Sequence, residues 1–423
     1  MPEPLDPKQV KNVLIVKMSS MGDVLHTFPS ALALRKLFPK AHLAWTVEAT
    51  HAGVLEGQAW LDETIIWKRR TSWAAWRTFR SQLNARKWDL AIDFQGLLRS
   101  GWITWLSGAE HRVGFSGLRE RPHWFYNNII PVKSWDCHAV ERLAWLVEHL
   151  GGELDTLPIE RPYLTQQPPQ NCSAAKYLFP LCPQPSDRQA VSQWLQKKGF
   201  DEVKHRLVLL APHCRREANR WPLARFANLA DRLLSDSRIK VALLGGPGAK
   251  TFCDQIEASA SSDLWRADGQ FSLLGSAALM QRSDMLLTGD TGPMHLAAGM
   301  GLPMVVLFGA TNPVRTGPYT SQAVGLNAGL SCSPCYAKKC PLGDRIPRCM
   351  QQIEVEEVYQ AIRGQLHFGE LPAETSFFQL NQSTYTHHAG HSGGSSKGQG
   401  PHRMASPPST SSPKQSPETD AKS

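Results

Sequence analysis

The chain has 423 residues, of which 42% are hydrophobic and 20% charged, with a mean hydropathy of −0.31. This length predicts about two or three domains, and the sequence has no apolar run near the roughly 20 residues of a membrane-spanning helix, which argues against an integral membrane protein. The 46 Lys and Arg residues outnumber the 37 Asp and Glu residues, and the net charge of +9 suits an anionic partner.

The N-terminal part of the chain alternates short β-branched runs with amphipathic stretches. The predicted strands are Val13 to Val16, His42 to Val47, Thr64 to Trp67, Leu90 to Phe94 and Arg112 to Phe115. The predicted helices are Ala31 to Phe38, Trp73 to Ala85 and His138 to Leu150. Strands that alternate with helices favour a parallel sheet covered on both faces.

The same alternation restarts after a stretch rich in Pro, Gln and Ser. The predicted strands are Leu207 to Leu210, Ile239 to Leu244, Met285 to Leu287 and Met304 to Phe308. The predicted helices are Pro222 to Leu234, Lys250 to Ser259, Ala277 to Arg282 and Met294 to Met300. Two similar halves of this kind place a cleft between them, at the carboxyl ends of both sheets.

These patterns predict four segments: an N-terminal domain over 1–165, a linker over 166–187, a C-terminal domain over 188–368 and a tail over 369–423. The tail is expected to be disordered, because its Ser, Gly, Pro and Lys cannot bury enough apolar surface to offset ordering entropy. The N-terminus is polar and the nine cysteines are an odd number in a long chain, which favours the reducing cytosol.

The first chemical motif is VLIVKMSSMGDVLHT, Val13 to Thr27, in which an apolar strand runs into a loop and then a helix. We expect Gly22 to give the backbone a conformation that a larger side chain would resist. Asp23 would then lie at the edge of the cleft, where a carboxylate acts as a general base. The alternative is that Asp23 only caps the helix.

The second motif is LLTGDTGPMH, Leu286 to His295, in which a strand ends at Gly-Asp-Thr-Gly and a helix begins near Pro293. A helix N-terminus offers free N–H groups and the positive end of the dipole, which together bind phosphate. His295, in the first turn, either faces the same ligand or is structural.

A basic region lies between Trp60 and Arg121, with eleven basic and six acidic residues and several interleaved tryptophans. It is interpreted either as a solvated helix face or as a dock for an anionic acceptor at a negatively charged membrane.

Four cysteines are clustered in CSPCYAKKCPLGDRIPRCM: Cys332, Cys335, Cys340 and Cys349. Their spacing suits a structural zinc or an iron–sulfur cluster. Local disulfides and plain thiols are the alternatives.

The two loop motifs and three further stretches together resemble the bacterial heptosyltransferases, glycosyltransferase family 9. In chain order the matching stretches are SSMGD, DFQGLLRSG, HAVERLAWLVEHLG, NRWPLARFANLA and GDTGPMH. The resemblance spans about Val13 to Arg363 and is weak in the linker and beyond Leu326. It implies a GT-B fold, α/β with two Rossmann-like domains facing each other across a cleft. The N-terminal domain would take the lipid acceptor and the C-terminal domain ADP-heptose.

The resemblance also implies an inverting transfer of heptose from ADP-L-glycero-D-manno-heptose to Kdo-lipid A, with Asp23 as the base. The implied donor-binding residues are Arg220, Asp290, Thr291, Gly292 and His295. The implied acceptor-binding residues are Lys68, Arg69, Arg70, Arg77, Arg80, Gln95, Arg119, Arg121 and Arg142. Asn219 stands where the family frequently has Lys, which makes Arg215 and Arg216 further candidates to neutralise the diphosphate. Arg220 and the helix after Thr291 would neutralise the diphosphate without a cofactor.

This interpretation predicts a peripheral protein on the cytoplasmic face of the anionic inner membrane, with no nucleic-acid partner. One alternative within the family is transfer of the second heptose or of a hexosamine. A UDP-sugar 2-epimerase would share the two-domain architecture. A nucleic-acid-binding protein would explain the positive charge but not the GDTGPMH turn.

Overall fold

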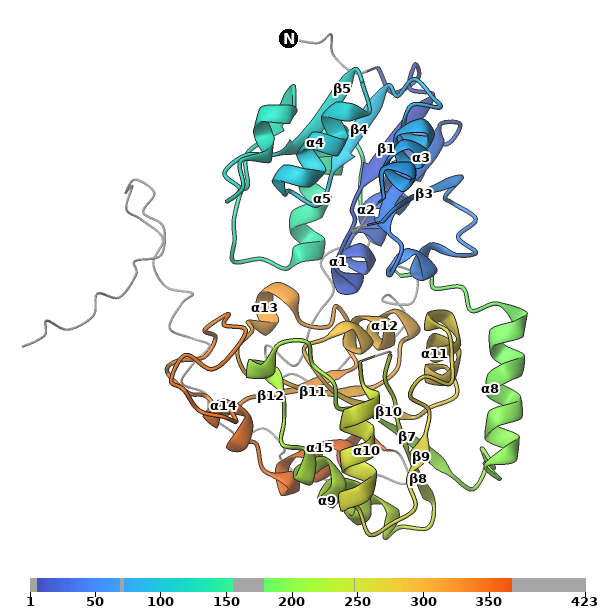
Figure 1. Cartoon of the computed structure of the whole chain (residues 1–423), viewed down its shortest axis with the longest axis vertical. Helices are drawn as coiled ribbons and strands as arrows, with labels where there is room; N and C mark the ends of the chain where they lie inside the picture. The colour runs from blue at the N-terminus through green and yellow to red at the C-terminus, as the bar shows by residue number, and fades with distance from the viewer. Residues whose placement is uncertain (1–5, 69–71, 155–178, 247, 367–423) are drawn as a thin grey trace, which may run out of the picture. The chain divides into compact units, whose positions relative to one another are not determined.

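The computed structural model describes residues 6–68, 72–154, 179–246 and 248–366, which form two parallel β-sheets with helices on both faces (Figure 1). Arg69, Arg70, residues 166–178 of the predicted linker and the whole predicted tail lie outside the described residues. No helix within the described ranges combines the length and apolar character needed to cross a membrane.

The first sheet has the strand order β3-β2-β1-β4-β5-β6, and all neighbouring strands are parallel. Its strands are β1 (Asn12–Val16), β2 (His42–Glu48), β3 (Glu63–Trp67), β4 (Leu90–Asp93), β5 (His111–Phe115) and β6 (Asn128–Ile130). The accompanying helices are α1 (Met21–His26), α2 (Phe28–Leu37), η1 (Ala52–Leu55), α3 (Trp73–Leu83), α4 (Leu98–Leu106), η2 (Pro122–Phe125) and α5 (Ala139–His149).

The second sheet has the order β12-β11-β10-β7-β8-β9 and is also parallel throughout. Its strands are β7 (Arg206–Ala211), β8 (Ile239–Leu243), β9 (Trp265–Arg266), β10 (Met285–Gly289), β11 (Met304–Leu307) and β12 (Ala323–Leu326). Its helices are α8 (Pro185–Lys197), η3 (Glu217–Asn219), α9 (Leu223–Leu234), α10 (Lys250–Ser259), α11 (Leu273–Met280), α12 (Gly292–Met300), α13 (Pro313–Thr316), α14 (Arg348–Gln351) and α15 (Val355–Gln365).

Both sheets share one topology. Counted from its own first strand, each has the order 3-2-1-4-5-6 of doubly wound nucleotide-binding domains. The order reverses between β1 and β4 in the first sheet and between β7 and β10 in the second. Because the chain leaves these neighbouring strands in opposite directions, a crevice for a ligand opens at their carboxyl ends.

Each sheet is covered on both faces, which explains why its central strands are apolar throughout. In the first sheet, α2 and α5 cover one face and α3 and α4 the other. In the second sheet, α11 and α12 cover one face and α9, α10 and α15 the other. Ile15 of β1 and Leu286 of β10 are therefore completely buried.

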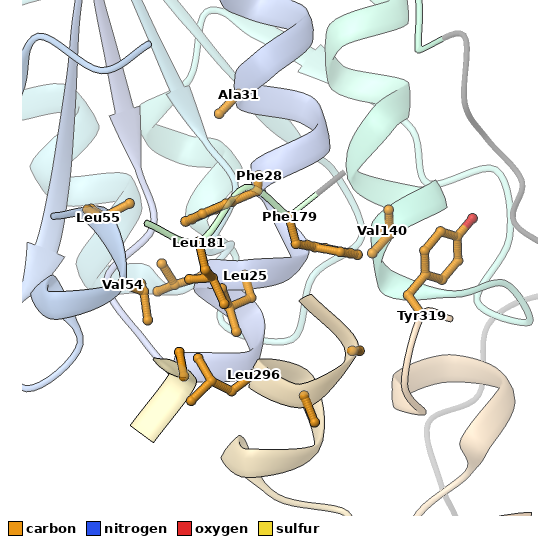
Figure 2. Close-up of a cluster of buried hydrophobic side chains, with 14 of the residues drawn as sticks. Leu25, Phe28, Ala31, Val54, Leu55, Val140, Phe179, Leu181, Leu296 and Tyr319 are labelled. Carbon is orange, nitrogen blue, oxygen red and sulfur yellow. The ribbon is translucent and has the colours of Figure 1, made fainter. Parts of the chain in front are cut away.

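One hydrophobic cluster is shared by the two halves of the chain (Figure 2). Leu25 of the first half lies close to Leu296 of α12, Phe28 lies beside Phe179, and Val140 of α5 lies beside Tyr319 of the second half. Phe179 and Leu181, on the segment before α8, fill the space between them. The two sheets are therefore joined by a common core.

The sequence analysis missed several helices. α8 begins at Pro185, inside the predicted linker. It was missed because its first residues, with Pro, Ser and Gln, have the composition of a loop, although proline is favourable at the first position of a helix. α4 (LRSGWITWL) has apolar residues on all sides, so its sequence lacks the polar stripe of an amphipathic helix. α15 at the end of the described chain was also missed.

The shared core generates a prediction about stability. Phe28 is completely buried, and its ring centroid lies 5.9 Å from that of Trp45 and 5.5 Å from that of Trp60. Phe28→Ala is expected to lower the free energy of unfolding by about 3 to 5 kcal/mol, because it leaves a cavity that neighbours fill only in part. Urea unfolding followed by far-UV circular dichroism measures this loss. The exposed Val203→Ala is the control and should change stability by less than about 0.5 kcal/mol.

Candidate active site

The loop between β1 and α1 is held by the end of β4. The side-chain oxygen of Gln95 accepts hydrogen bonds from the backbone N–H groups of Met18 and Ser19, each at 3.0 Å. Asp93 accepts a bond of 2.8 Å from the backbone N–H of Gln95 and so positions it. Gln95, expected to contact the acceptor, therefore has its oxygen engaged in fixing this loop.

Asp23 lies at the third position of α1 and completes a capping box. Its Oδ2 accepts bonds from the backbone N–H of Ser20 at 2.9 Å and from the Ser20 hydroxyl at 2.7 Å. Burial alone would raise the pKa of the carboxyl, but the charge of Lys17 and the Ser20 hydrogen bonds outweigh it and hold the pKa at about 2. Asp23 is thus an anion at neutral pH, and the capping role weighed from the sequence is real.

Lys17 is a functional candidate that the sequence analysis missed. Its side chain is 5% exposed, and its Nζ donates a 3.0 Å bond to the carbonyl of Phe94. Burial lowers the pKa of the ammonium, while the carboxylates of Asp23 and Asp93 raise it. A lysine directly after the apolar run VLIV was the available signal, since a buried charge requires a partner.

The second loop follows β10, where Thr291 is the N-cap of α12 and Pro293 lies in its first turn. Burial raises the pKa of Asp290. The Thr316 hydroxyl donates a 3.5 Å bond to the same carboxyl. Asp290, Thr291 and the N-terminus of α12 therefore lie together at the switch point of the second sheet.

The two motif loops touch each other. A Cβ atom added at Gly22 would lie 2.3 Å from the His295 ring, and one added at Gly292 would lie 2.2 Å from the terminal methyl carbon of Met21. We expected Gly22 to be needed for its backbone conformation. That reason was wrong, because φ at Gly22 is not in the left-handed region and the space is taken by His295.

Three histidines form a buried cluster where the loops meet. His26 Nε2 lies 3.0 Å from His295 Nδ1, and the ring centroid of His26 is 4.9 Å from that of His138. His138 Nδ1 accepts a bond from the backbone N–H of Val140, so its Nε2 carries the proton and donates to the carbonyl of Gly317. Burial lowers the pKa values of both His26 and His295. The cluster is therefore uncharged at neutral pH, and the His26 Nδ1 atom has no hydrogen-bond partner among the described residues.

Two arginines lie over one tryptophan near this cluster. The guanidinium of Arg142 lies 5.1 Å from the Trp135 ring centroid, and that of Arg315 lies 5.8 Å from it. Burial and the charge of Arg315 lower the pKa of Arg142, and the charge of Asp23 raises it. Arg142 was predicted as an acceptor contact, whereas Arg315 and Trp135 were missed because neither lies within a matching motif.

Arg220 follows η3, in the connection that leaves β7. Its Nε donates a 2.9 Å bond to the carbonyl of Cys214, and its guanidinium lies 5.0 Å from the Phe252 ring centroid. Asn219 is 1% exposed and its oxygen accepts a 2.8 Å bond from the backbone N–H of Ala310. Asn219 therefore ties the loops after β7 and β11 together and carries no charge that would neutralise a diphosphate.

The other predicted acceptor residues are dispersed. Arg77 and Arg80 lie on α3, which covers the sheet face opposite α1, and Lys68 follows β3. Arg119 and Arg121 lie in the connection between β5 and η2.

The clustered cysteines line one small cavity of about 20 Å³, but the structure does not support the expected zinc or iron–sulfur site. Within the described ranges, which include all four, no group of three or more His, Cys, Asp or Glu side chains is placed to hold a metal ion. Burial raises the pKa of the Cys349 thiol to about 11.

Two doubly wound sheets whose switch-point loops meet at a buried aspartate define the fold as that of a GT-B glycosyltransferase. Residues 76–345 match the family model described as glycosyltransferase family 9 (heptosyltransferase), and the chain belongs to this family.

Two named proteins are similar to this chain over most of their length. The lipopolysaccharide heptosyltransferase 1 of Pseudomonas aeruginosa is 28% identical over 348 residues, which cover 78% of this chain and 87% of that protein. The enzyme of the same name from Escherichia coli is 29% identical, with 73% of this chain and 90% of that protein covered.

Solved structures agree on the fold. The family 9 glycosyltransferase of Veillonella parvula superposes with a TM-score of 0.70 at 23% identity, covering 86% of this chain and 98% of that one. E. coli heptosyltransferase WaaC with ADP gives a TM-score of 0.60 at 24% identity, covering 83% and 99%. Because the chain belongs to family 9, it is classed as a glycosyltransferase and not as a UDP-sugar 2-epimerase or a nucleic-acid-binding protein.

The histidine cluster generates a prediction about pH. Burial lowers the folded-state pKa values of His26 and His295, whereas an unfolded histidine takes up a proton near pH 6.5. The unfolded state then binds more protons, so stability should fall as the pH decreases from about 7 towards about 5. Urea unfolding across this range measures the slope, which should be shallower in His26→Gln. Parallel profiles for the two proteins would show that the cluster is not the cause.

Proposed function

We propose that this family 9 glycosyltransferase transfers heptose from ADP-L-glycero-D-manno-heptose to the Kdo-lipid A inner core of lipopolysaccharide, the step that adds the first heptose. The observation that carries the proposal is the approach of the two switch-point loops, which places an anionic Asp23 beside the Asp290–His295 turn. The names of the two relatives described above support the choice of acceptor and of the first step.

In this proposal Asp23 is the general base. The acceptor hydroxyl attacks the anomeric carbon from the side opposite the diphosphate, so the configuration inverts. A carbon–oxygen bond to the acceptor forms, the bond to the diphosphate breaks with its electron pair leaving on ADP, and the hydroxyl proton passes to Asp23. A pKa of about 2 makes Asp23 a weak base for an ordinary alcohol, so the proton is transferred late, when bond formation has made the hydroxyl acidic.

The second half would bind the donor. Thr291, Gly292 and the free N–H groups at the start of α12 suit the diphosphate, because a helix N-terminus attracts anions. Arg220, from the loop after β7, would add the positive charge that the leaving ADP requires. His295 is neutral, so it would contribute a hydrogen bond and not a charge. These groups suffice for transfer that needs no metal ion.

The acceptor would approach from the first half. Arg142 and Arg315 flank Trp135 near Asp23 and suit the carboxylates and phosphates of a Kdo-lipid A headgroup. The more distant cations on α3 and before η2 would contact the rest of an anionic lipid. Such an acceptor is anchored in a bilayer, so the enzyme would work at an anionic cytoplasmic membrane surface. Transfer of the second heptose is the remaining alternative within the family.

Asp23→Asn tests the catalytic role. The amide keeps the size of the side chain and most of its capping ability but cannot accept the proton, so kcat should fall by roughly two to four orders of magnitude. Transfer is measured with ADP-heptose and Kdo-lipid A, and ADP binding should change little.

The matched control is Asp187→Asn in α8. Asp187 forms the same kind of capping box, accepting a 2.9 Å bond from the backbone N–H of Gln184, away from the motif loops. It should leave kcat unchanged. If Asp23→Asn also retains a normal kcat, the carboxylate is only a cap and the proposed mechanism is wrong.

Arg220→Ala tests the donor assignment. Losing a charged partner of the diphosphate should raise the KM for ADP-heptose about tenfold or more and reduce the thermal stabilisation by ADP. The exposed Arg238→Ala, in the turn before β8, is the control. If Arg220→Ala keeps a normal KM for ADP-heptose, another cation binds the diphosphate and the assignment of Arg220 is wrong.

A further inference from the structure

The three most exposed tryptophans of the described residues lie on one layer of the first half, while the less exposed Trp135 lies beside Arg142 and Arg315. Among the described residues, Trp73 is 72% exposed, Trp124 66% and Trp105 52%. They belong to α3, η2 and α4, and the exposed Leu98 begins α4. Large aromatic side chains are costly to leave in water, so three of them on adjoining elements indicate a surface that is covered in use.

These elements form one continuous outer layer. The rings of Trp76 on α3 and Trp102 on α4 stack at 5.2 Å with an interplanar angle of 11°. A Cβ added at Gly101 of α4 would lie 2.9 Å from Pro122 of η2. Figure 1 shows α3 and α4 in front of the first sheet, on the face that does not carry the shared core. We call this layer, with Trp73, Leu98, Trp105 and Trp124, the tryptophan face.

The charge of this layer is mainly positive. Arg77 on α3 and Arg119 and Arg121 before η2 are exposed, and the Arg121 guanidinium lies 5.9 Å from the Trp124 ring centroid. Of the nearby acidic groups, Glu120 accepts a 3.0 Å bond from the backbone N–H of Leu98. Tryptophan rings settle at the level of lipid headgroups, and arginines beside them attract anionic lipids.

An open groove lies on this face, beside α4 and η2. Leu98, Arg99, Trp102, Glu120 and Phe125 line an open groove of about 490 Å³. The groove starts at Leu98, three residues after Gln95, whose side chain holds the loop that leads to Asp23.

We propose that the tryptophan face lies on an anionic phospholipid bilayer, with Trp73, Trp105 and Trp124 at the headgroup level. This inference rests on the proposed transfer to a lipid-anchored acceptor and identifies the surface that meets the membrane. The aromatic side chains supply apolar burial and the surrounding arginines supply electrostatic attraction, the two components of interfacial binding. Binding should therefore weaken with salt and on neutral lipid.

The test is flotation of the full-length protein with vesicles of phosphatidylcholine that contain phosphatidylglycerol. The triple variant Trp73→Ala, Trp105→Ala, Trp124→Ala should bind these vesicles at least about tenfold more weakly than the natural chain. These side chains are more than half exposed, so its melting temperature should not change. The paired control Val203→Ala, Tyr336→Ala removes exposed apolar side chains of the second half and should bind normally.

Transfer to a water-soluble, deacylated acceptor separates this inference from the proposed function. The triple variant should retain that transfer and lose transfer to vesicle-bound acceptor. If the natural chain does not glycosylate the soluble acceptor, the proposed function is wrong. The flotation experiment still tests whether the tryptophan face binds the membrane. Equal vesicle binding by the triple variant would overturn the inference. The inference would also be overturned if the natural chain self-associates, the triple variant does not, and the variant still binds vesicles. The tryptophan face would then bind a second copy of the chain.

Discussion

The close approach of Gly22 to His295, and of Gly292 to Met21, is the constraint on which the site depends. Each glycine lies in the first turn of the helix that follows a motif loop, Gly22 in α1 and Gly292 in α12, and gives space to a side chain from the other half. A side chain at position 22 would collide with the His295 ring, whereas one at position 292 would have to displace the end of the flexible Met21 side chain. The hydrogen bond between His26 and His295, and the position of Asp23 beside the donor turn, exist only at this separation.

The electrostatics of the site follow from the same contact. The histidines that join the two halves are kept neutral by burial, whereas Asp23 is kept ionised by Lys17 and Ser20. A buried neutral cluster thus lies within the electrostatic influence of two buried charges, those of Asp23 and Lys17. Asp23, on α1 of the first half, carries negative charge, while Arg142 and Arg315 supply positive charge at Trp135. This separation suits a reaction that moves a proton and expels a diphosphate.

Much of this arrangement could be predicted from the sequence because it is local. Apolar runs such as VLIV mark strands, and GDTGP marks the strand-to-helix turn. What the sequence could not show depends on contacts between distant residues. Arg315 and Trp135 lie in no recognisable motif and meet only after folding. The sequence likewise does not show that the Gln95 oxygen accepts bonds from Met18 and Ser19. The cysteine spacing suited a metal, but spacing alone does not fix where the sulfur atoms lie.

The core shared by the two sheets bears on how such enzymes can diversify. Leu25 and Phe28 are buried partly by Leu296, Phe179 and Leu181, so neither half has a finished surface of its own. Recombination that exchanges one half between family members must bring a matching set of these side chains with it. A new donor or acceptor specificity is therefore more easily acquired by changing loops at the strand ends than by shuffling whole domains.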